Sequence, residues 1–279
     1  MPAPPPRFAD ALLASVETAL GARTPPQVAA LHRPPRLGRG PVDAEFCAVE
    51  LADGSIGLGY VLLDGAGDAL GTDRAAALAR PGTPSLALAR AYARADPLAR
   101  TLGLAAINAL SQHAMRVAGR TSPPAADSLG GLDPRPGERV GMVGWFPPLT
   151  RRVLERGASL VVVELDPALA GRRDGYEVTL DPAALAECDR VLATTTVLLN
   201  DTLDAVLAAC ARATRVVLLG PSGGFLPDAA FARGVHAIGG TQVIDRDGFV
   251  AALEAGAPWG AYARKTLLDA LDWPGPLRG

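Results

Sequence analysis

The chain has 279 residues, 49% of them hydrophobic and 20% charged, with a formal net charge of −2. These values are typical of a globular protein with a sizeable core and exclude a largely disordered chain, while the length favours two domains. The sequence has no block of Lys and Arg of the kind that follows a phosphate backbone, so we expect no nucleic-acid partner.

The N-terminal residues lack the basic start and the continuous apolar stretch of a signal peptide, and no window of membrane-spanning length is free of charges. The sequence therefore predicts a cytoplasmic protein that does not contact a membrane. Cys47, Cys188 and Cys210 are odd in number and far apart, which argues against a disulfide framework. We expect reduced thiols that serve as small core residues.

A small α+β unit is predicted for residues 1–122. Apolar residues at helical spacing predict a surface helix over residues 8–20. Two strands, at about 44–51 and 56–63, flank an Asp-Gly pair, which is the strongest local signal for a tight hairpin. From residue 73 to residue 119 the pattern is helical, and its prolines suit helix starts.

A linker is predicted for residues 123–138, because this stretch is rich in Pro and Gly and has almost no large apolar side chain. A Rossmann-like α/β domain is predicted for residues 139–279. Short β-rich runs alternate there with helical stretches: RVGMVGW, SLVVVELD, RVLATTT, TRVVLLG and VHAIGG. They match a parallel sheet covered by helices on both faces, in which ligands lie beyond the carboxyl ends of the strands.

The predicted strands end in loops with polar or backbone-exposing residues. Three threonines, residues 194–196, follow the third strand, and glycine-containing loops follow the first, fourth and fifth. These loops should converge on one crevice. Asn200 or Asp201 is expected to cap the next helix, with Asp204 in a capping-box position, so capping and ligand binding both stay open as roles for this segment.

The run GMVGWF differs from the dinucleotide fingerprint, because Gly141 and Gly144 are spaced differently and bulky residues follow them. Glu164, at the end of the second strand of this sheet, does sit where a ribose-binding carboxylate would. Local metal-binding spacings and a G-x-S-x-G elbow are absent from the sequence, and the three histidines could converge only through the fold.

Asn108 lies in the middle of a strongly apolar helical run, LGLAAINAL. A buried Asn needs hydrogen-bond partners for its amide, and neighbouring backbone would be sufficient. The alternative is that Asn108 faces a cleft between the two domains.

Several runs in order, LGLAAINAL, VGMVGWFPPL, VVVELDP, TTTVLLNDTLD and GPSGGFLPDAAFARGVHAIGGTQVID, resemble the bacterial and archaeal family described as "putative heavy-metal chelation" proteins. The resemblance extends from about residue 10 to about residue 268. It implies an enolase-N-terminal-like domain joined to a Rossmann-like domain, and a role in metal or metal-cofactor metabolism. The cleft residues that it implies are Asn108, Gly144, Trp145, Phe146, Glu164, Thr194, Thr196, Asn200, Thr202, Pro221, Ser222 and Thr241.

This chain differs from the family at two positions in that region. Asp201 stands where the family usually has a glycine between Asn and Thr, and Thr195 stands where a glycine is common. A side chain at either position could narrow the cleft or change the ligand.

The leading hypothesis is that the interdomain cleft binds a small polar metabolite or a metal chelate, with Glu164 as the main charge. The site is rich only in oxygen donors, which disfavours a bare soft metal ion. The alternative is an enzyme that uses a nucleotide-like cofactor such as S-adenosylmethionine, with Glu164 on the ribose. A noncatalytic subunit and a homo-oligomer are also compatible with the sequence, and whether the chain catalyses a reaction stays open.

Overall fold

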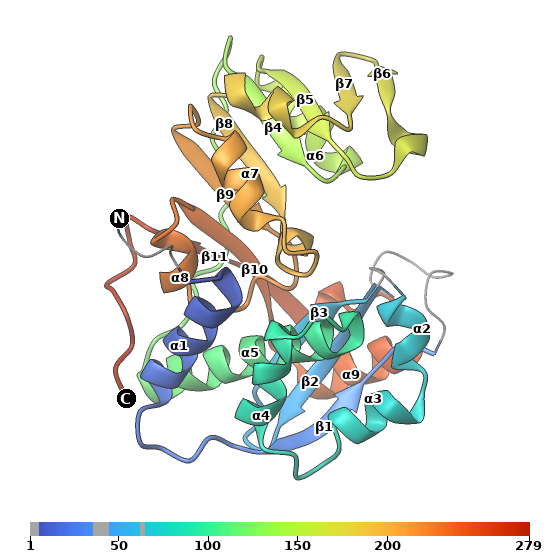
Figure 1. Cartoon of the computed structure of the whole chain (residues 1–279), viewed down its shortest axis with the longest axis vertical. Coiled ribbons are helices and arrows are strands. Elements are labelled where there is room, and N and C mark those ends of the chain that lie inside the picture. Colours follow the sequence, from blue (N-terminus) through green and yellow to red (C-terminus); the bar gives the residue numbers. More distant parts are fainter. Residues whose placement is uncertain (1–5, 36–44, 62–64) are drawn as a thin grey trace.

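A computed structural model of the chain describes residues 6–35, 45–61 and 65–279. The predicted strand limits at residue 44 and at residues 62–63 lie outside this described part. Figure 1 shows a smaller unit, built from N-terminal elements, below a larger β-sheet. Within the described ranges, no helix combines the length and the hydropathy that crossing a membrane requires.

The smaller unit contains a three-stranded antiparallel sheet, formed by β1 (Val28–His32), β2 (Phe46–Leu51) and β3 (Ile56–Tyr60). The hairpin between β2 and β3 is confirmed, and its turn is closed by a bond from Ser55 N to Asp53 Oδ1 at 3.0 Å. Strand β1 was not predicted, because its short sequence has no clear alternation.

Helix α5 (Pro97–Val117) covers one face of this small sheet. Helices α1 (Phe8–Leu20), α2 (Ala66–Leu70) and α4 (Ser85–Ala89) pack on α5, and α3 (Asp73–Leu78) packs on α2. Helix α5 starts at a proline, as expected, and the side chain of Asp96 caps it by accepting a bond from Ala99 N at 2.7 Å. Its backbone lies directly on β3, because Gly57 has no side chain to hold the two apart: a Cβ there would be 2.1 Å from Ala105 O.

The larger sheet has eight strands in the order β11-β10-β9-β8-β4-β5-β7-β6. The inner pairings are parallel, and only the outermost strands β11 and β6 are antiparallel to their neighbours. The strands are β4 (Arg139–Val143), β5 (Ser159–Val163), β6 (Gly171–Arg173), β7 (Tyr176–Thr179), β8 (Arg190–Thr194), β9 (Arg215–Leu219), β10 (Ala237–Val243) and β11 (Ala263–Asp269). The predicted α/β fold class, a parallel-sheet domain preceded by a small α+β unit, is confirmed.

Both faces of this sheet are covered, which explains the nearly continuous apolar runs. On one face, side chains such as Val191 and Leu218 join a core with α7 (Leu203–Ala209) and α8 (Asp228–Phe231). On the other face, side chains such as Met142 and Val162 pack with α6 (Pro147–Glu155).

Two segments carry contacts across the predicted domain limits. Helix α9 (Arg246–Glu254) packs on the face of the small sheet opposite α5, where Phe249 and Leu253 meet Phe46 and Leu58 (Figure 1). Residues 123–138 also pack against the larger sheet, with Leu129 and Leu132 buried in its core. The domain limits at 1–122, 123–138 and 139–279 therefore remain a prediction, and the contacts between the units are extensive.

Candidate functional site

The carboxyl edge of the larger sheet is directed toward the smaller unit. Tyr92 donates a hydrogen bond from its hydroxyl to Leu198 O at 2.7 Å, and Arg100 Nη1 donates to Leu199 O at 3.0 Å, both in the loop that follows β8. Beyond its pairing with β9, strand β10 continues to β3. The loops that follow β8 and β9 therefore lie at the interface between the two units, since Asn108 also bonds to Ser222 O.

A cavity of about 370 Å³ lies in this interface. Its walls come from the β2–β3 hairpin, the second half of α5 and the turn after it, the loop after β9, and strands β10 and β11. It is lined by Asp53, Gly54, Ser55, Ile56, Gly57, Leu58, Asn108, Gln112, Met115, Arg116, Gly119, Arg120, Thr121, Ser122, Pro221, Gly224, Thr241, Gln242 and Thr266. Its volume falls within the range of about 300–1,000 Å³ that is usual for small-molecule sites.

Three of the predicted site residues, Asn108, Pro221 and Thr241, line this cavity. Asn108 Nδ2 donates to Leu58 O at 2.8 Å and to Ser222 O at 2.9 Å, so its amide joins the small sheet to the loop after β9. Asn108 Oδ1 and Ser222 Oγ are buried without a hydrogen-bond partner. Ser222 is fully buried behind the cavity wall and is not one of its lining residues.

The other predicted residues lie apart from the cavity, at the ends of β4, β5 and β8, and are half-buried. They are Gly144, Trp145, Phe146, Glu164, Thr194, Thr196, Asn200 and Thr202. The structure therefore divides the predicted cleft into a cavity and a separate strand-end group.

Glu164, the charge expected to bind the ligand, has backbone partners in this strand-end group. One carboxylate oxygen accepts a hydrogen bond from Trp145 N, and the other accepts from Leu165 N at 3.0 Å. The indole of Trp145 in turn donates to Tyr176 Oη at 3.1 Å. The carboxylate thus stabilises the loop after β4.

The threonine and asparagine side chains of this group also bond locally. Thr194 Oγ1 accepts hydrogen bonds from Thr196 N and Thr196 Oγ1, each at 3.2 Å, and Asn200 Oδ1 accepts one from Thr202 Oγ1 at 2.6 Å. These side chains therefore form hydrogen bonds within their own loop, as in Asx and ST turns.

The caps expected for α7 were wrong. Its N-cap is Thr202, whose side chain makes no capping bond, and Asp204 pairs with Arg233 at 3.2 Å. The backbone of Asp201 has a φ of 61°, a left-handed conformation that a glycine adopts at no cost. A glycine, which the resemblance implies at this position, would adopt this conformation without strain. The Asp201 carboxylate lies 3.8 Å from Arg100, away from the cavity lining.

Several cavity residues were missed by sequence analysis: Asp53, Gln112, Arg116, Arg120, Gln242 and Thr266. Asp53 was read only as a turn residue, although it accepts hydrogen bonds from Arg116 and, at 2.5 Å, from His113. Burial raises the pKa of Asp53, but the bonds from His113 and Ser55 and the charge of Arg116 outweigh it, so the pKa lies below its ordinary value. Asp53 is therefore an anion at neutral pH.

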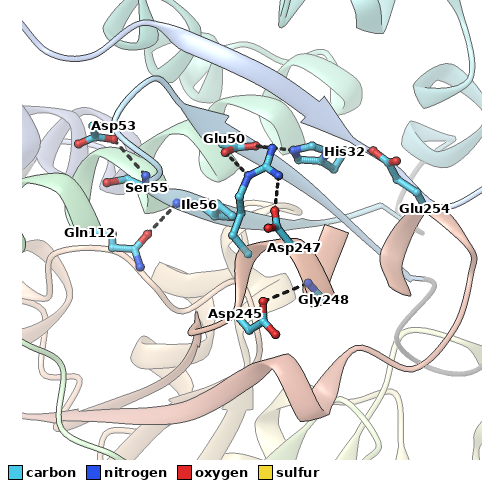
Figure 2. Close-up of polar contacts among 11 residues, drawn as sticks. His32, Glu50, Asp53, Ser55, Ile56, Gln112, Asp245, Asp247, Gly248 and Glu254 are labelled. Atoms are coloured by element: carbon cyan, nitrogen blue, oxygen red, sulfur yellow. Dashed lines mark hydrogen bonds and ion pairs between the residues drawn. The ribbon is translucent and has the colours of Figure 1, made fainter. Parts of the chain in front are cut away.

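A second polar cluster joins α9 to the small sheet. His32 lies between Glu50, at 2.7 Å, and Glu254, at 2.8 Å, while Arg246 donates to both oxygens of Glu50, at 2.7 and 3.0 Å. Figure 2 shows His32, Glu50 and Glu254 together, apart from Asp53, Ser55 and Gln112 at the hairpin. The cluster stabilises the contact between the two parts of the chain.

The described residues form no group of three or more His, Cys, Asp or Glu side chains that could hold a metal ion. The three histidines do not converge, because His32, His113 and His236 bond to different partners. All three cysteines are buried free thiols, and burial raises the pKa of Cys47 and of Cys210 to about 12. The cavity offers one carboxylate, already paired, and neither thiolate nor imidazole. This donor set does not fit a bare heavy-metal ion.

The fold and the cavity define an α/β protein with a partly open cavity between a Rossmann-like sheet and a small α+β unit. The chain belongs to the family described as "Putative heavy-metal chelation", since one profile of that description matches residues 127–271 and another matches residues 42–111. The predicted family is thereby confirmed.

An uncharacterized protein of Methanocaldococcus jannaschii is 33% identical over 162 residues, which are 54% of this chain and 58% of that protein. The match thus spans little more than half of the length of this relative. Two solved structures, from Pyrococcus horikoshii and Desulfitobacterium hafniense, have TM-scores of 0.68 and 0.69 and are each 21% identical to the chain. They cover 94% of this chain, and 100% and 97% of their own chains. Both are described as proteins of unknown function, so the likeness shows the fold alone.

Proposed function

We propose that the chain binds a small polar metabolite, or a metal already held in an organic chelate, in the cavity between the two units. The observation that carries this proposal is an interface cavity of about 370 Å³ with amide, hydroxyl and guanidinium groups in its wall. Well-packed interfaces rarely leave hollows of this size, so a cavity with a mixed polar and apolar lining supports a ligand site.

The family description names heavy metals, and the proposal reconciles it with the donor set of the cavity. Soft metal ions prefer thiolate and imidazole ligands, and the cavity wall offers neither. A metal enclosed by an organic ligand would present oxygen atoms to the protein instead. Neutral donors such as Thr241 and Gln242 suit such a surface.

Isothermal titration tests the proposal. We expect free Ni²⁺, Co²⁺ and Zn²⁺ to give no specific heat, and at least one of their citrate chelates, or citrate alone, to bind. Thr241→Phe, which places a ring in the cavity, should abolish that binding. Thr83→Phe is a matched control, because Thr83 is half-buried as Thr241 is but does not line the cavity. Tight binding of a free metal ion that both variants retain would contradict the proposal.

The alternative of an enzyme with a nucleotide-like cofactor has one supporting observation, the position of Glu164 at the carboxyl end of β5. Both of its oxygens accept backbone bonds, so a ribose would have to share them. A thermal-shift screen separates the two proposals: stabilisation by S-adenosylmethionine that Glu164→Ala removes would favour the enzyme. The leading proposal also includes a cytoplasmic location and the absence of a nucleic-acid partner.

A further inference from the structure

We propose that the ligand of the cavity is an anion with carboxylate or phosphate oxygens, and that Arg116 and Arg120 bind its charge. This inference rests on the proposed function and names the class of ligand. It depends on four features of the wall: the position of Arg120, the net charge, the free guanidinium donors and the orientation of two glutamine amides.

The turn at the end of α5 determines the position of Arg120. The helix finishes at Val117, and Gly119 follows with a φ of 67°. Arg120 N donates to Met115 O at 2.8 Å and Gly119 N donates to Arg116 O at 3.1 Å, which are the two bonds of a Schellman motif. Because Gly119 reverses the chain, Arg116 in the last turn and Arg120 beyond it both reach the cavity wall.

The guanidinium of Arg120 is held in place by the C-terminal segment. Its Nη1 donates to Gly275 O at 2.8 Å, and its Cζ lies 5.2 Å from the centre of the Trp273 ring. A cation on an aromatic face keeps its remaining N–H groups free to donate in its own plane. The guanidinium is therefore oriented before any ligand binds.

The charged side chains of the cavity wall carry a net positive charge. Two of them, Arg116 and Arg120, are cations, and Asp53 is the single anion among the lining residues. Asp53 also contacts His113. The carboxyl end of α5 adds the negative end of the helix dipole, about half a charge, so a single arginine opposite Asp53 would leave the wall negative. The second arginine leaves a field that favours an anion.

Both guanidinium groups retain unused donors. An arginine has five N–H groups, and Arg116 uses one of them on Asp53 while its side chain stays 57% exposed. Arginine donors in a planar fork match the geometry of carboxylate and phosphate oxygens. Asp53 acts on the ligand indirectly, as a positioning residue for Arg116.

The glutamines of the wall also present donors. Gln112 Oε1 accepts from Ile56 N at 2.7 Å, and Gln242 Oε1 accepts from Arg264 at 2.7 and 3.1 Å. Those partners can only donate, so each glutamine amide must direct its oxygen toward them. The NH₂ group of each amide is then left to donate to another acceptor. Among the described residues neither NH₂ group has a hydrogen-bond acceptor, so a ligand rich in oxygen atoms would supply the missing acceptor for each of them.

Titration of the full chain with phosphate, succinate, citrate, Ni(II)–citrate and the neutral polyol erythritol tests the inference. We expect at least one anion to bind, more weakly as ionic strength rises, and erythritol to bind worse. Arg116→Gln and Arg120→Gln should each weaken that anion by about 10- to 100-fold, the usual worth of a hydrogen bond to a charged group. Arg152→Gln should leave the affinity unchanged, because Arg152 is exposed on α6 and away from the cavity.

The outcomes separate the inference from the proposed function. If both cavity variants keep wild-type affinity, if erythritol binds better than every anion, or if none of the four anions binds, the assignment of an anionic ligand is wrong. In the first two cases, loss of binding in Thr241→Phe would still support the cavity as the site. Binding that Thr241→Phe leaves intact would overturn both. Arg116 is exposed and its variant should fold, so unchanged circular dichroism keeps a loss of affinity interpretable.

Discussion

Glu50 is the most heavily paired buried carboxylate of the small sheet. It is 6% exposed and accepts hydrogen bonds from Arg246 and His32. Burial raises the pKa of its carboxyl, but the bonds from Arg246 and His32 together outweigh burial, so the pKa lies below its ordinary value. Such a group stabilises the fold above the pKa of an unfolded glutamate, about 4.3, and that contribution is lost as the pH falls through the folded pKa.

We therefore expect Glu50→Gln to lower the free energy of unfolding by about 2 kcal/mol at pH 7, because the bonds lose their charge. The difference from wild type should shrink as the pH falls from about 5 to 3, where the wild-type carboxylate also becomes neutral. Urea unfolding at several pH values measures it. Glu155→Gln is the control, since the Arg151–Glu155 pair is exposed and should be worth less than about 1 kcal/mol. A pH-independent difference would show that the charge of Glu50 is not responsible.

At this scale the sequence locates site residues only in part. Polar residues at strand ends could be predicted from the parallel sheet, and Asn108 stood out because an amide in an apolar helix needs partners. Arg116 and Arg120 could not be separated from ordinary surface arginines. Their role depends on the turn at Gly119 and on contacts with Trp273 and Gly275, more than 150 residues away in sequence.

Secondary-structure elements, like site residues, can be predicted where their local sequence pattern is clear and are missed where distant contacts determine them. The inner strands β4, β5, β8 and β9 are short, mostly apolar runs, and sequence analysis finds them because burial on both faces leaves few polar positions. The strands β6 and β11 lie at the edges of the sheet, and β7 lies next to one edge. These strands carry polar residues such as Arg172 and Lys265 and obtain their conformation from a neighbouring strand. Their pairing partners decide the structure, so the local sequence gives little signal.

The contact between α5 and β3 places the hairpin at the cavity, and Gly57 makes it possible. We expect Gly57→Ala to destabilise the fold by at least about 3 kcal/mol, because the new methyl group would meet backbone atoms of α5 that cannot move independently. Gly71→Ala is the matched control: its Cβ would have one neighbour, at 3.7 Å, and the change should be within about 1 kcal/mol of neutral. Chemical denaturation measures both, and equal stabilities would show that α5 can shift away from β3.

The two units of the molecule are joined by more than a linker. Their interface includes the bridging amide of Asn108, the hydroxyl of Tyr92 and the bond from Leu226 N to Ser111 Oγ at 3.1 Å. Composition alone suggested a connector at residues 123–138. In the structure Leu267 N donates to Pro123 O at 2.9 Å, and Leu132 is buried, so this segment is part of the second unit's packing. Proline and glycine content cannot distinguish a free linker from one that is held along a sheet edge.

The smaller unit depends on a helix supplied from the far end of the chain. Helix α9 places Phe249 and Leu253 on the face of the small sheet formed by Phe46, Ile56 and Leu58. A fragment of residues 1–122 would expose that apolar face to water, at a cost of about 25 cal/mol for each Å². We expect this fragment to bind a hydrophobic dye and to unfold without a cooperative transition, whereas the full chain unfolds cooperatively.

Adding a peptide of residues 245–262 should restore a cooperative transition to the fragment, because the peptide covers the exposed face and returns Arg246 to Glu50. The same peptide with Phe249→Ser should fail, since Phe249 is fully buried and a hydroxyl there would lack a partner. Calorimetry and dye fluorescence measure both mixtures. A sharp, dye-free transition of the fragment alone would mean that the smaller unit folds independently within the predicted limits, and that α9 only docks on a sheet that is already stable.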